Sequence, residues 1–132
     1  MIVYRVEITD TDYSGYKVNS NIGVGPYTGV SGFAEIICSD SSSSSHPTPK
    51  NDSNLGKVFD SDHVCCFKSL EQLHTWFDLI PDLSDHDKKL FKISTYQIKD
   101  EYYHQGKFQS IAHSEHMVLL EEHPINFGLR GY

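Results

Sequence analysis

The stretch HVCCFKSLEQLHTWF, residues 63–77, carries the clearest structural signals in the chain and decides its fold class. Residues 63–67 form a short apolar run of the kind that makes a buried strand. Ser69 and Gln72 then have the spacing of a capping box, in which two side chains bond backbone N–H groups at the start of a helix. Leucine and aromatic residues recur at helical spacing after Ser69, and Pro81 is expected to end the helix. A strand therefore leads directly into one main helix.

Further strands are predicted on both sides of this unit. The opening residues alternate apolar and mixed positions up to Thr9, and β-branched and aromatic residues dominate 91–98. Ser84 opens a short second helix through Leu90. Residues 107–112 and 116–120 supply two more strands. The sequence predicts an α+β fold with a small, mostly antiparallel sheet and its helices on one face.

Turn-forming residues and a serine run mark the connections. Residues 10–32 mix turn formers with three tyrosines, which predicts an ordered loop, and residues 33–38 fit either a short strand or a helical turn. Residues 39–62 include a five-serine run and two prolines, so we expect a long, low-complexity surface loop that adds little to the core. The whole chain, 1–132, is then a single domain.

Charge and cysteine content restrict the compartment and the partners. The 132 residues carry a formal charge of −7, which disfavours direct binding to nucleic acid. The three cysteines, Cys38, Cys65 and Cys66, are an odd number with an adjacent pair, which is typical of a reducing compartment. No signal peptide or apolar run of membrane-spanning length is visible. We expect a cytoplasmic protein without a membrane partner.

Metal binding and thiol catalysis are both disfavoured by spacing. His113 and His116, with Glu115 and His123 nearby, are the densest group of metal-binding residue types. If this stretch is a strand, positions 113 and 116 point to opposite faces and cannot share an ion. The adjacent pair of Cys65 and Cys66 lacks the gap of a zinc knuckle. Cys66 lies in an apolar strand without a flanking base. We predict no metal, and exposed histidines.

The segment 23–27, GVGPY, has a glycine-rich appearance without the context of a phosphate loop. No helix pattern follows it, and Pro26 lacks the backbone donor that a phosphate cradle needs. A dinucleotide fingerprint is excluded. A tight turn with Tyr27 buried behind it and a ligand-binding loop both stay open.

The order of several motifs resembles a family of small bacteriophage proteins. The shared features are the pair Tyr4-Arg5, the turn at 25–27, the strand-to-helix unit that closes on Trp-Phe, the strand 93–98 and the segment 106–109, GKFQ. They cover about three quarters of the chain. The resemblance implies a phage-encoded accessory protein that acts on a host or defence component in the cytoplasm of the host cell.

The order of elements is also similar to the split-sheet fold of ADP-ribosyltransferases, which bind NAD. That resemblance implies that Arg5 holds a phosphate or ribose, beside Tyr4, that Tyr27 stacks on a ring, and that Ser69 lies at the sheet edge near the ligand. Gln109 stands where the family has a catalytic glutamate. A neutral amide lacks the charge that stabilises an oxocarbenium-like transition state, so a fold that only binds fits Gln109 better. Glu115 and Glu121 are the alternative carboxylates.

Four functions follow from these resemblances and from the charge. The leading one is a phage accessory protein that acts through a cleft for NAD or ADP-ribose or as a protein inhibitor. The others are an active NAD-dependent transferase that modifies a host protein, an acidic inhibitor of a nucleic-acid-binding protein, and a sponge for a nucleotide signal. The acidic residues are spread evenly, eight in residues 1–66 and ten in residues 67–132, which favours a solvated surface as much as a nucleic-acid mimic.

Overall fold

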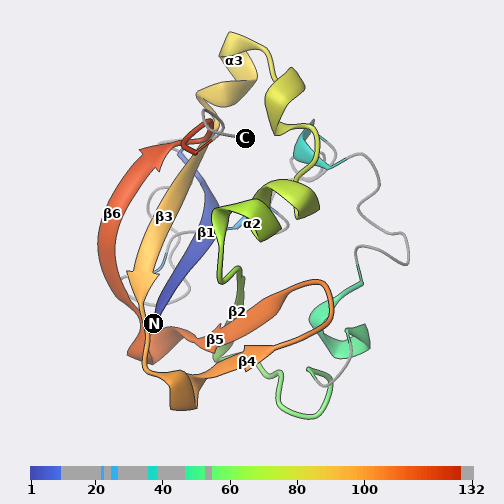
Figure 1. Cartoon of the computed structure of the whole chain (residues 1–132), viewed down its shortest axis with the longest axis vertical. Helices are drawn as coiled ribbons and strands as arrows, with labels where there is room; N and C mark the ends of the chain where they lie inside the picture. Colours follow the sequence, from blue (N-terminus) through green and yellow to red (C-terminus); the bar gives the residue numbers. More distant parts are fainter. Residues whose placement is uncertain (10–21, 23–24, 27–35, 39–46, 53–54, 129–132) are drawn as a thin grey trace.

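Two three-stranded antiparallel sheets form the frame of the protein (Figure 1). The structure is a computed structural model that describes residues 1–9, 22, 25–26, 36–38, 47–52 and 55–128. The first sheet has the order β1 (Ile2–Ile8), β3 (Phe91–Gln97), β6 (Val118–Pro124), and the second has the order β2 (His63–Cys66), β5 (Ser110–His113), β4 (Tyr103–Gln105). The predicted α+β class is confirmed, but the strands divide between two sheets. Within the described ranges, no helix is long and apolar enough to cross a membrane.

The two sheets meet where β1 passes the end of β2. The backbone N–H of Tyr4 donates to the carbonyl of Phe67 at 2.8 Å, and the N–H of Phe67 donates to the carbonyl of Tyr4 at 2.9 Å. Because a strand presents alternate residues to opposite faces, β1 contributes to two cores. Val6 and Ile8 pack with the helices on one face, and Val3 packs with the second sheet on the other. We call this junction the seam.

Helix α2 (Leu70–Trp76) begins as the sequence predicts but ends earlier. The N–H of Gln72 donates to the Ser69 hydroxyl at 3.1 Å, and the Gln72 side chain accepts from the N–H of Lys68 at 3.3 Å. The expected continuation to Pro81 is wrong. A proline ring at position 81 would clash with the helical carbonyl of Phe77, so the chain leaves the helix four residues before it. Pro81 lies instead in the short 3-10 helix η2 (Ile80–Asp82), where no helical carbonyl opposes it.

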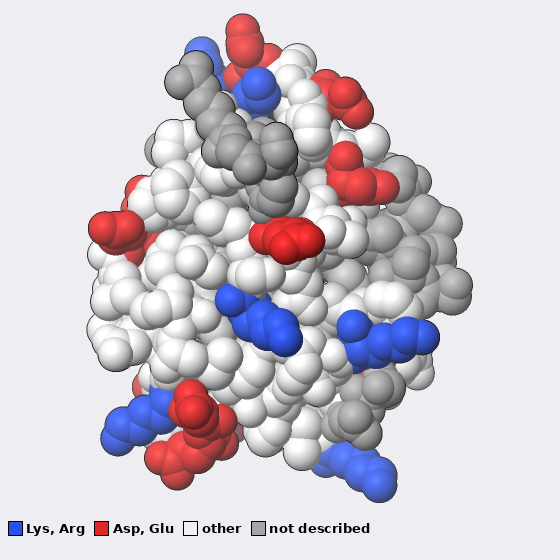
Figure 2. Space-filling model, viewed as in Figure 1, with Lys and Arg blue, Asp and Glu red and all other residues white. Residues whose placement is uncertain are grey.

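The second helix, α3 (Asp85–Lys88), has the predicted cap: the N–H of Asp87 donates to the Ser84 hydroxyl at 3.1 Å. It lies at the end of the molecule opposite the second sheet (Figure 1). Charged side chains on the viewed surface are scattered singly or in small groups of both signs (Figure 2). That distribution fits a solvated surface better than a continuous acidic stripe.

The segment around 100–118 differs most from the prediction. A 3-10 helix, η3 (Asp100–Tyr102), and strand β4 lie where the sequence predicts no element, and a second 3-10 helix, η4 (Ser114–His116), separates β5 from β6. The predicted strand at 116–120 therefore begins later, at Val118. Because η4 turns the chain back, the rings of His113 and His116 lie 4.9 Å apart. The expectation that these two histidines point to opposite faces is wrong.

The predicted low-complexity loop 39–62 contains packed structure in the parts that are described, which exclude 39–46 and 53–54. The 3-10 helix η1 (Pro49–Asn51) is followed by two buried residues, Asp52 and Leu55, which are 3% and 0% exposed. This half of the loop therefore contributes to the interior, unlike the sequence expectation. Most of the predicted ordered loop 10–32 lies outside the described residues, although Ile22 is buried. Of 33–38, Ile36 and Ile37 are helical.

Stability is expected to fall on acidification because of His74 on α2. Its Nε2 bonds the carbonyl of Phe127 at 3.1 Å, and Gly128, at a φ of 84°, packs on Leu70 of the same helix. Desolvation lowers the pKa of His74 below its ordinary 6.5, partly offset by the bond to Phe127. The unfolded chain then binds a proton more readily, so stability present above pH 6.5 is lost as the pH falls toward the folded-state pKa.

Thermal melts between pH 7.5 and 5 check this prediction. The loss in the free energy of unfolding between these two pH values is expected to be below about 1 kcal/mol, because solvent screens the half-exposed ring of His74. His74→Gln should flatten the pH profile in this window, whereas His86→Gln, on the exposed surface of α3, should leave its slope unchanged. Equal slopes for the wild type and His74→Gln would show that His74 is not responsible.

Candidate functional site

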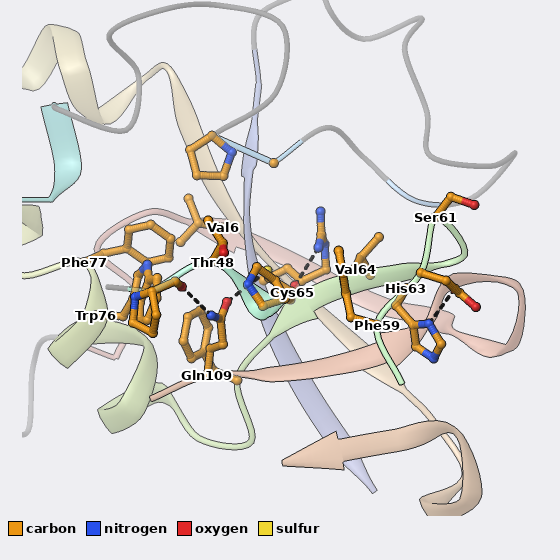
Figure 3. Close-up of a pocket in the computed structure, with 17 residues that line it drawn as sticks. Val6, Thr48, Phe59, Ser61, His63, Val64, Cys65, Trp76, Phe77 and Gln109 are labelled. Atoms are coloured by element: carbon orange, nitrogen blue, oxygen red, sulfur yellow. Dashed lines mark hydrogen bonds and ion pairs between the residues drawn. The ribbon is translucent and has the colours of Figure 1, made fainter. Parts of the chain in front are cut away.

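A pocket of about 470 Å³ opens beside the seam, within the range of small-ligand sites (Figure 3). β1 is the edge strand of its sheet here, so side chains from both of its faces, Arg5 and Val6, reach the pocket. Trp76 and Phe77 lie at one end, and Ser61 and His63 lie at the other (Figure 3). The pocket is therefore an elongated groove that runs from the start of β2 to the end of α2.

Most of the pocket wall is apolar and rigid. Phe67 contacts the rings of Trp76 and Phe77 with both centroid distances at 5.8 Å. Three prolines and a further aromatic residue complete these walls: Pro26, Pro47, Pro49 and Phe59. Aromatic and proline side chains lose little conformational entropy when a ligand binds, because few of their torsions are free. The walls suit a planar, largely apolar ligand.

Arg5 contributes a cation whose charge is already balanced. Its Nε donates to Glu7 at 3.1 Å, and its Nη1 donates to the Cys65 carbonyl at 2.5 Å. Glu7 also accepts from the hydroxyls of Ser94 and Tyr96, both at 2.6 Å. Both charged side chains are nearly fully buried. The pair ties β1 to β3 and to β2, and it leaves the pocket without a strong positive field.

Gln109 lies at the other side of the same pocket, 1% exposed. Its Oε1 accepts from the Cys65 thiol at 3.1 Å, and its Nε2 donates to the Pro47 carbonyl at 2.7 Å. Burial raises the pKa of Cys65 to about 11, more than Arg5 lowers it, and burial also raises the pKa of Cys66 strongly. Both thiols are therefore protonated at neutral pH, which makes them poor nucleophiles.

The wall beside Gln109 is held by a buried carboxylate. Asp52 accepts from the backbone N–H groups of Lys107, Phe108 and Gln109, with shortest distances of 2.6, 3.1 and 3.0 Å. A Cβ on Gly106 would lie 2.7 Å from Asp52, so the close approach requires glycine. We call residues 47–52 the strap. It is fixed to the β4–β5 hairpin at both ends, through Asp52 and through Pro47.

The structure brings together only part of the predicted site. Arg5 and Gln109 line one pocket, as the transferase resemblance requires. Tyr4 packs against the core beside α2, and Ser69 caps α2; neither lines the pocket. Tyr27 lies outside the described residues. The lining residues that sequence reasoning missed include Asp60 and His63.

The two alternative carboxylates lie elsewhere. Glu115 is exposed on η4, and Glu121 is exposed on β6, where it pairs with His123 at 3.1 Å. Asp60 is the lining carboxylate among the described residues, and its Oδ1 bonds His63 Nδ1 at 2.7 Å. That hydrogen bond is the main cause that lowers the pKa of Asp60. The pocket thus carries its negative charge at the end away from Gln109.

Comparison with known proteins identifies the family. The family described as "Bacteriophage T4 Y00F protein" matches residues 1–126. The chain belongs to this phage family. The predicted resemblance to small bacteriophage proteins is thereby confirmed. No curated protein and no solved structure is significantly similar to the chain, so the resemblance to ADP-ribosyltransferases receives no support from these comparisons. The matched residues include both sheets, both helices and every described residue that lines the pocket.

Proposed function

We propose that this phage protein binds a small planar ligand of the nucleoside type in the pocket at the seam and holds it without reacting. In an infected cell, the protein would act as a sponge that withdraws a nucleotide signal from a host or defence component. The observation that carries this proposal is the combination of rigid aromatic and proline walls with a buried, neutral Gln109 at their side.

The apolar walls supply most of the expected affinity. Burying an aromatic ring removes about 150–250 Å² from water, which is worth about 4–6 kcal/mol before the costs of association. Three polar residues, Thr48, Ser61 and His63, line the groove and would orient a ribose or a base edge. A nucleoside combines a planar ring with such a polar group, and it fits the pocket's volume.

The charge balance favours a neutral or singly charged ligand. Arg5 is offset by Glu7, and Asp60 adds a negative charge to the rim. A diphosphate such as that of NAD or ADP-ribose gains less here than in a site with unbalanced cations. NAD and ADP-ribose, the ligands expected from the transferase resemblance, should therefore bind more weakly than neutral nucleosides.

Binding without transfer follows from the chemistry of the groups that line the groove. Transfer of ADP-ribose needs a carboxylate that stabilises positive charge beside the scissile bond. Gln109 is neutral, and both of its amide atoms are engaged by Cys65 and Pro47. Asp60 is bonded to His63 at the opposite end. An acidic inhibitor of a nucleic-acid-binding protein is less favoured, because charges of both signs are interspersed on the viewed surface (Figure 2).

A ligand panel tests the proposal. Adenosine, AMP, NAD and ADP-ribose are titrated against the protein by calorimetry and thermal shift, and nicotinamide release from NAD is measured. We expect micromolar to millimolar binding of adenosine, weaker binding of AMP, NAD and ADP-ribose, whose phosphates find no unbalanced cation in the pocket, and no nicotinamide release. Ser61→Trp, at an exposed lining position, should fill the groove and reduce affinity at least tenfold.

Asn126→Trp is the matched control, because Asn126 is exposed and does not line the pocket. It should bind the panel like the wild type. The absence of a shift with every ligand, or equal affinity in Ser61→Trp, would refute the proposed function. Nicotinamide release that depends on Gln109 would restore the transferase hypothesis.

A further inference from the structure

Four histidines that are scattered in the sequence meet at one corner of the second sheet. They are His63 on β2, His104 on β4, His113 on β5 and His116 on η4, and we call them the histidine cluster. The ring centroid of His63 lies 5.7 Å from that of His104 and 5.3 Å from that of His113. His113 and His116 are 4.9 Å apart. Half of the eight histidines in the chain are therefore neighbours.

The strand register explains why they meet. His63 lies directly opposite His113, and His104 lies opposite Ile111, two residues before His113 on the middle strand. Residues two apart on a strand share a face, so His63, His113 and His104 belong to one face of the sheet. The rings of His63 and His104 come from the two outer strands and approach each other across β5. The fourth ring, His116, arrives through the turn η4.

The nitrogen atoms of two of these rings have the character of metal ligands. The bond between Asp60 and His63 Nδ1 assigns the proton to Nδ1 and leaves the lone pair on Nε2, the arrangement found behind metal-bound histidines. His113 Nδ1 is buried and has no hydrogen-bond partner. Leaving a buried ring nitrogen without a hydrogen-bond partner costs free energy, and a bound ion is one arrangement that would supply the missing partner.

The two ring separations measured from His63 fit ligands of a single ion. A zinc–nitrogen bond of about 2.0–2.1 Å puts the imidazole centroid about 3.2 Å from the metal, so two rings at a tetrahedral angle have centroids about 5.2 Å apart. The pairs of His63 with His113 and with His104 are close to that value. Among the described residues, no group of three or more His, Cys, Asp or Glu side chains is already placed to hold a metal ion. The rings must therefore turn about their Cβ–Cγ bonds, a torsion with broad, shallow minima.

We propose that the histidine cluster binds one transition-metal dication, of the class that includes Zn²⁺, Ni²⁺, Co²⁺ and Cu²⁺. Imidazole ligands suit these ions, whereas Mg²⁺ and Ca²⁺ require oxygen. His63 and His113 are the first two ligands, and His104 is the third. Asp60 is a positioning residue that holds the His63 ring. Tyr102 stacks on His116 at 3.6 Å and supports the exposed side of the cluster. This site shares Asp60 and His63 with one end of the nucleoside pocket, but it does not rest on the proposed function.

Titration of the metal-free protein with Zn²⁺ and Ni²⁺, with Mg²⁺ as a control, tests this inference. We expect binding of one Zn²⁺ or Ni²⁺ per chain, a rise in melting temperature, and no response to Mg²⁺. Co²⁺ should give the visible absorption of a low-symmetry site with nitrogen ligands. Affinity should fall steeply between pH 7.5 and 5.5, because protonated imidazole cannot bind a metal.

Variants separate this cluster from other metal-binding groups. His63→Gln and His113→Gln should each weaken Zn²⁺ at least tenfold, and Asp60→Asn should weaken it about tenfold without removing a ligand. His86→Gln and Cys65→Ser should bind like the wild type. Absence of stoichiometric Zn²⁺ and Ni²⁺ binding, or full affinity in the double variant of His63 and His113, overturns the inference. Adenosine titration of His113→Gln, whose side chain does not line the pocket, shows whether the nucleoside site is intact, so the two proposals can fail separately.

Discussion

Glu7→Ala is expected to destabilise the protein by about 3–5 kcal/mol, a large part of the stability of a small domain. The substitution leaves the guanidinium of Arg5 buried without the carboxylate that balances its charge, and it removes the acceptor of two buried hydroxyls, those of Ser94 and Tyr96. Chemical denaturation of the wild type and the variant measures the difference. Because Arg5 lines the pocket, ligand affinity should fall as well.

A double-mutant cycle separates the charge from the hydrogen bonds. In Glu7→Gln the amide oxygen can still accept from Arg5 and Tyr96, and the amide NH2 can donate to the Ser94 hydroxyl. The variant should therefore lower the free energy of unfolding by only about 1–2 kcal/mol. Combined with Arg5→Met, it should cost less than the sum of the two single changes, since no unpaired charge stays buried. The control is Glu122→Ala, which breaks the exposed pair with Lys92 at 2.6 Å and should cost less than about 1 kcal/mol. Equal losses for Glu7→Ala and Glu122→Ala would contradict this interpretation of the buried network.

The sequence predicted those helices and strands that are determined by their own residues, through capping side chains and apolar patterns. The Ser69 and Ser84 caps lie where the sequence placed them, and the strands at 2–8, 63–66 and 91–97 follow their apolar and β-branched patterns. The length of α2 was overestimated, because apolar residues continue at helical spacing to Ile80 while Pro81 acts on the backbone before it. β4 has only three residues, none of them fully buried, and its pairing with β5 is a long-range property that no short pattern contains.

The candidate site was predictable only in part, for a related reason. Arg5 and Gln109 were singled out from a resemblance, and they do share a pocket. Glu7 follows Arg5 by two positions on the same strand, so this pair was within reach of the sequence, whereas the contact of Gln109 with Cys65 joins segments 44 residues apart. The histidine cluster was missed because its members come from three strands and a turn. The expected strand through His116 would have separated His116 from His113, and only the 3-10 turn at 114–116 brings the two rings together.

Asp52→Ala is expected to destabilise the protein by about 3 kcal/mol and to weaken ligand binding at the same time. The side chain sits in a stretch whose serine-rich composition predicts a loop, yet its carboxylate accepts three backbone N–H groups of the β4–β5 turn. Removing a buried acceptor leaves these donors without partners, which costs about 1–3 kcal/mol, and more when the acceptor is charged. Asp52→Asn keeps one oxygen and should cost about 1–2 kcal/mol.

The functional part of this prediction depends on the strap. Without Asp52, residues 47–49 keep one described bond to the hairpin, from Gln109 to Pro47, so the proline wall of the pocket should lose its fixed position. Ile98→Ala is the control: it removes a buried side chain that does not line the pocket and should cost about 2–5 kcal/mol. At a temperature where both variants are folded, adenosine affinity should fall at least fivefold in Asp52→Ala and stay within twofold of the wild type in Ile98→Ala. Equal affinities in the two variants would mean that the strap stabilises the fold without shaping the site.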